Sequence, residues 1–252
     1  MNAAAPFFLK AFAMKKTVIF CSAILACALV ACAAILVNPS VVFRNAGGIK
    51  VKGTAVERVQ SDAAEWGAKI YVRAPSLRAA AAEAEKFAAL AKAEFEKRSV
   101  RRAEFSAVSA SPVYKVEKGA TTNVVEAYAA ALSISVSANS REEIANVEAA
   151  CSELLKSGVP IFPGEARYYY TGLESLKMRL LEAAAQNARE RAEKLVSGSG
   201  SKLGPVVSAS QGIFQITRPL SNDTSDWGMY DTSSFEKDVK CVVTIEFSAA
   251  GR

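Results

Sequence analysis

A run of twenty-one residues without a charged side chain, Thr17–Val37, constrains this 252-residue chain more than any other feature. A helix needs about 20 apolar residues to cross the hydrocarbon layer of a membrane, so the run is long enough for one transmembrane helix. Three lysines and no acidic residue precede it. By the positive-inside rule, residues 1–16 then stay in the cytoplasm and the remainder is exported. We therefore expect a signal anchor at residues 17–37 of a single-pass inner-membrane protein, with the C-terminal domain on the periplasmic or extracellular side.

Two processed forms stay open beside the uncleaved anchor. A cleaved signal peptide has a shorter apolar region and a small-residue cleavage site, for which residues 31–33, ACA, would serve. Residues 29–32, LVAC, also resemble the processing box of a lipoprotein, with a lipid on Cys32. The apolar run continues to Val37, which argues against both forms, and all three readings export the bulk of the chain. Met1 and Met14, which two lysines follow, both stay open as the start.

Half of the net charge of +6 belongs to the N-terminal segment. Of the 31 basic residues three lie there, which leaves 28 against 25 acidic residues in the rest of the chain. No dense basic run and no interleaving of aromatic with basic residues stands out in the sequence. We therefore expect no nucleic-acid partner.

Two of the five cysteines, Cys151 and Cys241, lie outside the apolar run. They are far apart in sequence and form no metal-ligand pattern. Export would permit a disulfide between them. Cys241 alternates with the apolar residues of an expected strand, and Cys151 falls on the apolar face of an expected helix. We therefore favour two buried structural thiols over a disulfide.

Period-two alternation and apolar stripes at helical spacing divide the exported part into strands and helices. The expected strands cover residues 49–60, 65–74, 101–116, 123–138, 159–170, 203–217 and 238–247. The expected helices cover residues 76–98, 140–157 and 171–196. Short turns between paired strands indicate antiparallel sheet, so the fold class is α+β with three helices in the order ββα–ββα–βα–ββ. We expect a linker at residues 38–48 and one α+β domain at residues 49–252.

Local signals mark the helix ends and the buried faces. Ser140 with Glu143, and Thr171 with Glu174, have the spacing of capping boxes, and Gly158 suits the left-handed position that ends a helix. The expected apolar stripe of the first helix is Leu77, Ala80, Ala84, Phe87, Ala91 and Phe95. The expected buried stripes of the other two are Ile144, Val147, Cys151, Leu154 and Leu155, and Leu176, Leu180, Ala184, Ala188, Ala192 and Leu195. In the strand at residues 65–74, one face carries Lys69, Tyr71 and Arg73, and the other Trp66, Ala68, Ile70 and Val72.

Three glycines, Gly198, Gly200 and Gly204, follow the last helix and crowd a lysine and several serines. A phosphate-binding loop places its glycines after a strand and before a helix, whose N-terminus then faces the phosphate. Here the order is helix, glycines, strand, and the C-terminal end of a helix repels an anion. We interpret the glycines as a helix stop, with Gly198 or Gly200 in the left-handed conformation.

The absence of histidine removes the commonest general base and every dyad or zinc site that needs it. A serine–lysine dyad needs none, and Ser199–Lys202 and Ser234–Lys237 have the S-x-x-K spacing. Such a dyad requires the serine at a helix start. The first pair instead lies in a glycine-rich exit loop and the second beside a polar turn. We predict no catalytic residue, no cofactor and no metal site, and therefore a protein that is not an enzyme.

Residues 218–234, RPLSNDTSDWGMYDTSS, form a polar connection far longer than an ordinary hairpin loop. Trp227, Met229 and Tyr230 lie within it, and aromatic and methionine side chains are enriched at protein interfaces. We hypothesise that these three residues make an intersubunit or partner contact. The alternative is that the rings fold back onto the edge of their own sheet.

Several segments together resemble the SIMPL-domain family, many of whose members are exported bacterial proteins of unassigned biochemical role. The stretch VKGTAVERVQSDAAEW is similar to the opening pattern of that family at Val51, Gly53, Ala55, Val59, Asp62, Ala63 and Trp66. A helix, a glycine–serine turn and a strand resemble its C-terminal hallmark at Asn187, Ala188, Arg189, Ala192, Gly204, Ser210 and Gly212. The stretch KDVKCVVTIEF resembles its closing strand. The resemblance covers residues 48–248.

The resemblance implies an α+β fold, a place in the cell envelope and, in some members, assembly into large ring-like oligomers. It supplies no catalytic residue. We therefore expect a non-enzymatic, membrane-anchored envelope protein that acts through self-association or through binding of an envelope partner. The alternative is a periplasmic protein that binds a small molecule or a peptide and protects against stress, since links to oxidative stress have been proposed for relatives.

Overall fold

A computed structural model describes residues 25–30, 32–33, 48–198 and 200–250. The chain divides into two compact units, one of Met1–Val51, Arg189–Ala209 and Ile245–Arg252, the other of Lys52–Ala188 and Ser210–Thr244. The helices are α3 (Leu77–Lys97), α4 (Arg141–Lys156) and α5 (Leu173–Ser197), beside helical residues 25–30 and 32–33. The strands are β1 (Ile49–Gln60), β2 (Ala63–Ala74), β3 (Ala103–Phe105), β4 (Ser109–Glu117), β5 (Ala120–Ala138), β6 (Ile161–Pro163), β7 (Arg167–Tyr169), β8 (Lys202–Gln211), β9 (Gln215–Thr217), β10 (Met229–Tyr230) and β11 (Glu236–Ala250).

The predicted anchor at residues 17–37 lies mostly outside the described residues. Residues 25–30 and 32–33 are described, and they are helical and exposed. Within the described part of the chain, no helix combines the length and the apolar character that a membrane crossing requires.

The predicted α+β class is confirmed, and both sheets are built mainly from antiparallel pairs. Each of the three expected helices in the region of residues 49–252 is present, but three of the expected strands are interrupted. Residues 101–116 form β3 and β4, residues 159–170 form β6 and β7, and residues 203–217 form β8 and β9.

A serine hydroxyl explains the first of these interruptions. The pairs Phe105↔Ile134 and Ser109↔Ala131 show that one extra residue lies between β3 and β4 relative to β5. Ser106 fills this irregularity, because its backbone N–H donates to the carbonyl of Ser133 at 2.9 Å and its Oγ accepts from the Ser133 N–H at 2.9 Å. A side chain thus replaces one backbone partner, which strand periodicity alone does not reveal.

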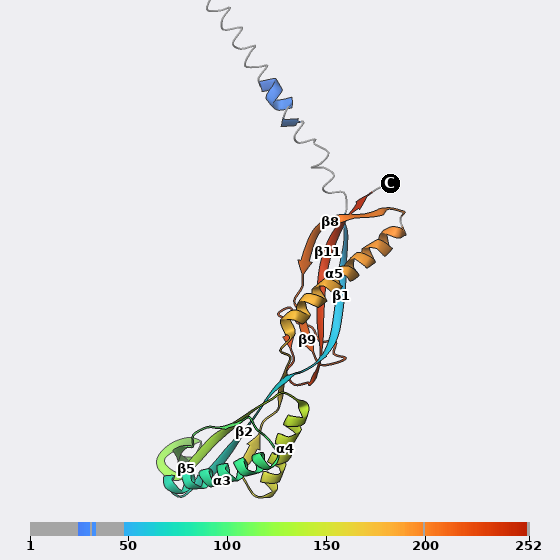
Figure 1. The fold of residues 1–252 in the computed structure, drawn as a ribbon. Helices are drawn as coiled ribbons and strands as arrows, with labels where there is room; N and C mark the ends of the chain where they lie inside the picture. The colour runs from blue at the N-terminus through green and yellow to red at the C-terminus, as the bar shows by residue number, and fades with distance from the viewer. Residues whose placement is uncertain (1–24, 31, 34–47, 199, 251–252) are drawn as a thin grey trace, which may run out of the picture. The chain divides into compact units, whose positions relative to one another are not determined.

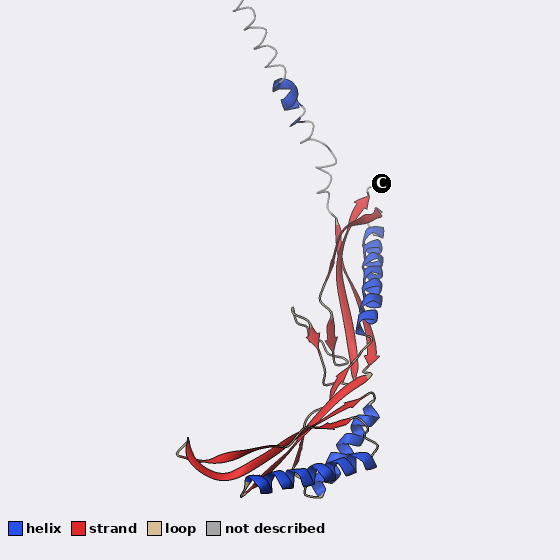
Figure 2. Cartoon of the chain, turned by 60° about the vertical axis from the view of Figure 1, so that its left-hand side comes forward, coloured by secondary structure: helices blue, strands red, loops and turns tan. Residues whose placement is uncertain are grey.

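The six-stranded sheet has the order β3-β5-β2-β6, with β4 paired to β5 and β7 paired to β2. Helices α3 and α4 cover one face of it (Figures 1 and 2). The buried face predicted for β2 is confirmed, and Trp66 packs edge-on against Phe95 of α3 with ring centroids 6.4 Å apart. The opposite face carries no described helix, and we call it the open face. Its exposed residues include Glu65, Lys69, Tyr71, Arg73, Ser133, Ser135 and Ser137.

The helix ends follow one predicted capping box but not the other. Ser140 caps α4 by accepting from the Glu143 N–H at 3.2 Å, and the Glu143 carboxylate reaches back to the N–H of Asn139. Thr171 was expected to cap α5, but its N–H and its hydroxyl both donate to Asp62, each at 2.7 Å. Thr171 therefore binds Asp62, between β1 and β2, and does not act as the N-terminal cap of α5. Gly158 has the expected left-handed conformation, with φ +81°.

The five-stranded sheet has the order β1-β11-β9-β10, with β8 paired to β11, and α5 carries the longest buried helical stripe. Three predictions within the stripes are wrong, because Leu77, Leu155 and Leu195 are exposed. Val196 takes the buried position expected of Leu195. The buried residues of α5 are Leu176, Leu180, Ala184, Ala188, Ala192 and Val196. Successive buried residues are always four positions apart, whereas a straight stripe alternates spacings of three and four. The buried stripe of α5 therefore winds slowly around the helix.

Two further predictions are confirmed. Gly200 follows α5 with φ +70°, so the glycines do end this helix in a left-handed conformation. Cys151 and Cys241 are buried free thiols, as favoured over a disulfide. Cys241 lies in a row of buried residues on alternate positions of β11 with Val239, Val243, Ile245 and Phe247.

Candidate functional site

The polar connection at residues 218–234 returns to the edge of its own sheet. Its strand β10 pairs with β9 in parallel, with Met229 beside Gln215 and Tyr230 beside Ile216. The N–H of Asp231 then donates to the carbonyl of Ile216 at 2.9 Å. The backbone at Met229 and Tyr230 is therefore held by the sheet.

Trp227 at the tip of this connection projects into solvent. Its side chain is 93% exposed, and Tyr230 is 47% exposed. The buried Gln215 side chain fixes the backbone below the ring, because its Nε2 donates to the carbonyl of Ser225 at 2.7 Å. Ser225 Oγ in turn accepts from the N–H of Trp227 at 3.2 Å. An exposed tryptophan on a hydrogen-bonded backbone is an ordered apolar surface that water solvates poorly.

A hollow of about 560 Å³ lies beside the tryptophan. Residues 211–214 and 216, residues 227–230, and Leu173 and Lys177 of α5 line it. Lys177 is its cation: its Nζ lies 5.9 Å from the ring centroid of Phe214 and 2.7 Å from the carboxylate of Glu174. The hollow is thus mainly apolar, with one ammonium group that is already paired.

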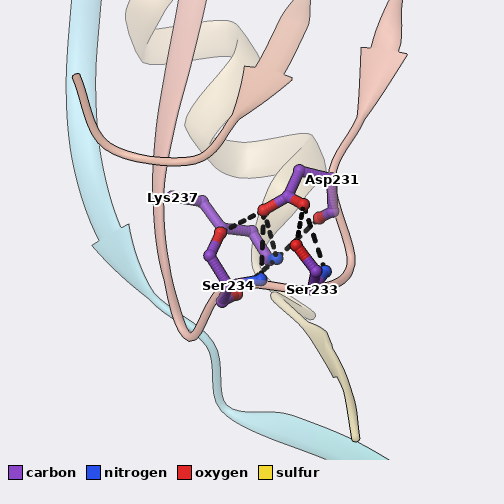
Figure 3. A network of polar contacts seen from close by, with 4 residues as sticks. All are labelled: Asp231, Ser233, Ser234 and Lys237. Atoms are coloured by element: carbon purple, nitrogen blue, oxygen red, sulfur yellow. Dashed lines mark hydrogen bonds and ion pairs between the residues drawn. The ribbon is translucent and has the colours of Figure 1, made fainter. Parts of the chain in front are cut away.

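A buried lysine anchors the C-terminal end of the connection (Figure 3). Lys237 is 1% exposed, and its Nζ donates to the carbonyls of Asp231 at 2.6 Å and Ser234 at 2.8 Å. The carboxylate of Asp231 lies 3.7 Å from the same ammonium and accepts hydrogen bonds from the hydroxyls of Ser233 and Ser234. The network holds a turn of backbone that would otherwise leave two buried carbonyls without a partner.

The same network sets the charge states of its members. Burial favours the neutral carboxyl of Asp231, but the hydrogen bonds from Ser234 and Ser233 outweigh it and lower the pKa to about 2. Burial lowers the pKa of Lys237, and the nearby Asp231 opposes that shift. A charged pair inside the structure is costly unless it is hydrogen-bonded on both sides, as it is here.

Within the described residues, neither serine–lysine pair has the geometry of a catalytic dyad. Ser199 lies outside them. At the other pair, Lys237 contacts the carbonyl of Ser234, while the Ser234 hydroxyl donates to Asp231. The ammonium therefore organises the backbone and does not face the hydroxyl as a base.

Cys151 and Cys241 have structural surroundings, whereas Cys27 and Cys32 are exposed. Burial raises the pKa of Cys151 to about 12, and burial also raises the pKa of Cys241, so both thiols stay protonated at neutral pH. Among the described residues, no three cysteine, aspartate or glutamate side chains gather closely enough to hold a metal ion.

The sequence hallmarks at β1 and α5 meet in space. The main chain at Gly53 passes so close to α5 that an added Cβ would meet the carbonyl of Ala184 and lie 2.6 Å from the nitrogen of Ala188. Asn187 Oδ1 accepts from the N–H of Thr54 at 3.1 Å. These hallmark residues therefore fix the packing of a strand on a helix.

Sequence reasoning missed the role of Lys237 and Gln215. The signal for Lys237 was present, because it continues the alternate positions of β11 occupied by Val239 and Cys241. That parity places a lysine on the buried face. Nothing in the sequence indicated which carbonyls it would bind.

Comparison with family models confirms the resemblance to the SIMPL-domain family. A model described as SIMPL, a protein of unknown function (DUF541), matches residues 49–247. The chain belongs to the SIMPL family. A comparison with curated proteins finds no match.

Proposed function

We propose that this protein is a non-enzymatic, membrane-anchored component of the cell envelope that acts through a contact made by Trp227, Met229 and Tyr230 of residues 218–234. The contact joins copies of the chain or binds an envelope partner. The observation that carries the proposal is the 93% exposure of Trp227 on a backbone that Gln215 and Lys237 hold in place. Burying such a ring in an interface removes a large apolar area from water at little conformational cost.

The anchor and the export are part of the same proposal. They rest on the uncharged run at residues 17–37 and the lysines before it, which favour an inner-membrane location with the folded part outside the cytoplasm. The membership of a family described only as of unknown function leaves the biochemical role open to experiment.

The double variant Trp227→Ala, Tyr230→Ala tests the contact. Both side chains are exposed, so we expect the assembly of the full chain in mild detergent to weaken by tenfold or more in dissociation constant. The thermal midpoint should stay within a few degrees of the wild type, since exposed side chains contribute little to folding. Sedimentation velocity gives the first quantity and differential scanning calorimetry the second.

Leu220→Ala is the matched control, because Leu220 is an equally solvent-exposed apolar side chain of the same connection but does not line the hollow. It should leave assembly unchanged. An early-unfolding double variant would place the rings in the core. If the double variant assembles like the wild type and co-purifies with the same envelope proteins, the proposed contact is contradicted. Residues 218–234 would then only connect two strands.

The hollow beside Trp227 supports the second candidate function, binding of a small molecule or peptide. Its volume of about 560 Å³ falls within the range of small-molecule sites. A ligand there would raise the thermal midpoint of the wild type but not that of the double variant. Self-association would instead make the midpoint depend on protein concentration.

A further inference from the structure

The open face of the six-stranded sheet gathers two aromatic rings and two cations. Lys69, Tyr71 and Arg73 occupy alternate positions of β2 on this face. Phe162 of β6 lies opposite Lys69, which makes it a diagonal neighbour of Tyr71. Tyr71 is 40% exposed and Phe162 is 59% exposed. Two neighbouring strands therefore offer adjacent aromatic surfaces to the solvent.

The strands next to these rings carry small side chains. In the register of the sheet, Tyr71 is followed by Ala131 and then Ser109, and Arg73 is followed by Ala129 and Ser111. A further serine, Ser133, lies opposite Lys69. No bulky side chain in these three rows closes off the rings, so a flat molecule can approach them and reach serine hydroxyls beside them.

The charges on the open face are unevenly distributed. Among the described residues, neither Lys69 nor Arg73 takes part in an ion pair, and their rows hold no carboxylate. The acidic residues of this face lie further along the strands. Glu104 is in the row of Gly67 and Ser135, and Glu65 accepts from the Tyr169 hydroxyl at 3.2 Å. Arg167 of β7 lies opposite Glu65, so that end carries two acids and one cation. The aromatic end carries the two cations Lys69 and Arg73 and no acid in their rows.

We propose that this part of the open face binds a polysaccharide that carries carboxylate groups. The C–H faces of sugar rings stack on Tyr71 and Phe162, because the faces of aromatic rings carry negative charge density. Lys69 and Arg73 pair with sugar carboxylates, and the two cations are about 13 Å apart along the strand. The serine hydroxyls of β4 and β5 exchange hydrogen bonds with sugar hydroxyls. This site is separate from the contact of residues 218–234 and does not depend on it.

The charge pattern favours an acidic polysaccharide over a nucleic acid. A single-stranded nucleic acid carries a charge on every nucleotide and is held by a groove of cations that follows its backbone. The open face offers Lys69 and Arg73 and then meets Glu104 and Glu65, with Arg167 opposite Glu65. The two acids interrupt the row of cations and would repel a continuous phosphate backbone.

Affinity electrophoresis of the full chain in mild detergent, in gels that contain polygalacturonate, tests the proposal. We expect the polymer to retard the chain, and fully methyl-esterified polygalacturonate to retard it at least fivefold less. The ring variant is the double substitution Tyr71→Ala, Phe162→Ala, and the cation variant is the double substitution Lys69→Gln, Arg73→Gln. Each of these two variants should lose most of the retardation.

Matched controls lie elsewhere in the same unit. Tyr114→Ala removes a tyrosine of the same exposure, 43%, from β4, and Arg78→Gln, Lys86→Gln removes two cations from α3 on the other side of the sheet. Both should keep the full retardation. The proposal is overturned if the ester retards the chain equally or if the ring variant binds like the wild type. It also fails if single-stranded oligonucleotides or anionic vesicles bind more tightly, or if the ring variant changes the oligomer mass, since that would make the open face an intersubunit surface.

Discussion

Lys237 shows how a single charged residue can position a surface loop. Its ammonium has no access to water and is surrounded by the carbonyls of Asp231 and Ser234 and the carboxylate of Asp231. Removing the ammonium would take this hydrogen bond from both carbonyls, which costs about 1–3 kcal/mol for each group that stays buried. The residue therefore fixes where the connection at residues 218–234 ends and, through it, where β10 meets the sheet.

The low pKa of Asp231 makes the stability of this region dependent on pH. The carboxyl group has a pKa of about 2 in the folded chain and the usual 3.8 when unfolded. Its contribution is complete above pH 3.8 and is lost as the pH falls through 2, which amounts to about 2 kcal/mol. We predict that Asp231→Asn lowers the thermal midpoint at pH 6, and that this difference shrinks as the pH approaches 2.

Asp226→Asn is the control for this measurement, because Asp226 is an exposed aspartate of the same connection. Thermal unfolding followed by calorimetry at several pH values should give it the wild-type profile. A pH profile for Asp231→Asn that runs parallel to the wild type would show that the carboxylate does not carry the dependence.

At the scale of elements, the approach of β1 to α5 depends on one missing side chain. A Cβ at Gly53 would collide with the carbonyl of Ala184 and the backbone of Ala188, and backbone cannot rotate away as a side chain can. We predict that Gly53→Ala destabilises the protein by about 1–3 kcal/mol. Thermal unfolding should show this as a midpoint lowered by several degrees.

Gly67→Ala provides the comparison at another strand glycine. The nearest atom to a Cβ there is the carbonyl of Ile134 at 3.5 Å, an ordinary contact distance. This variant should stay within about 0.5 kcal/mol of the wild type. Equal effects of the two substitutions would mean that strand propensity, and not the contact with α5, decides the cost.

The elements also show how far sequence patterns reach. Apolar periodicity located α3, α4 and α5 and the buried face of β2, because burial on one side leaves a direct trace in the sequence. The interruption between β3 and β4 could not be predicted, since it depends on the hydroxyl of Ser106, which accepts a hydrogen bond from Ser133, 27 positions away. Thr171 was misassigned for the same reason, because Asp62 is its partner only in the folded chain.

The candidate surface was predictable in composition but not in geometry. The length of the connection and its aromatic residues drew attention to Trp227, Met229 and Tyr230. Only the structure shows that the backbone of Met229 and Tyr230 pairs with β9 while the ring of Trp227 stays in solvent. The backbone before Trp227 is held by Gln215 of β9 through the carbonyl of Ser225, a contact that the sequence does not reveal.

At the scale of the whole molecule, the proposed anchor predicts how the chain fractionates. The chain should stay in the membrane pellet after a carbonate wash at high pH, because an apolar helix of about 20 residues does not leave the bilayer under those conditions. Immunoblotting of the pellet and supernatant measures this. Mature protein that begins near Ala34, or that carries a lipid on Cys32, would replace the anchor by one of the processed forms.

The central claim is that the exposed tip of residues 218–234 makes the functional contact, and photo-crosslinking in intact cells tests it most directly. A photoreactive phenylalanine analogue replaces Trp227 in the full chain, and in a second strain it replaces the exposed Lys86 on α3. We predict a discrete adduct of higher mass from position 227, whose mass spectrum contains peptides of a second copy or of one envelope protein, and none from position 86. No adduct from position 227, or the same set of adducts from both positions, would contradict the account.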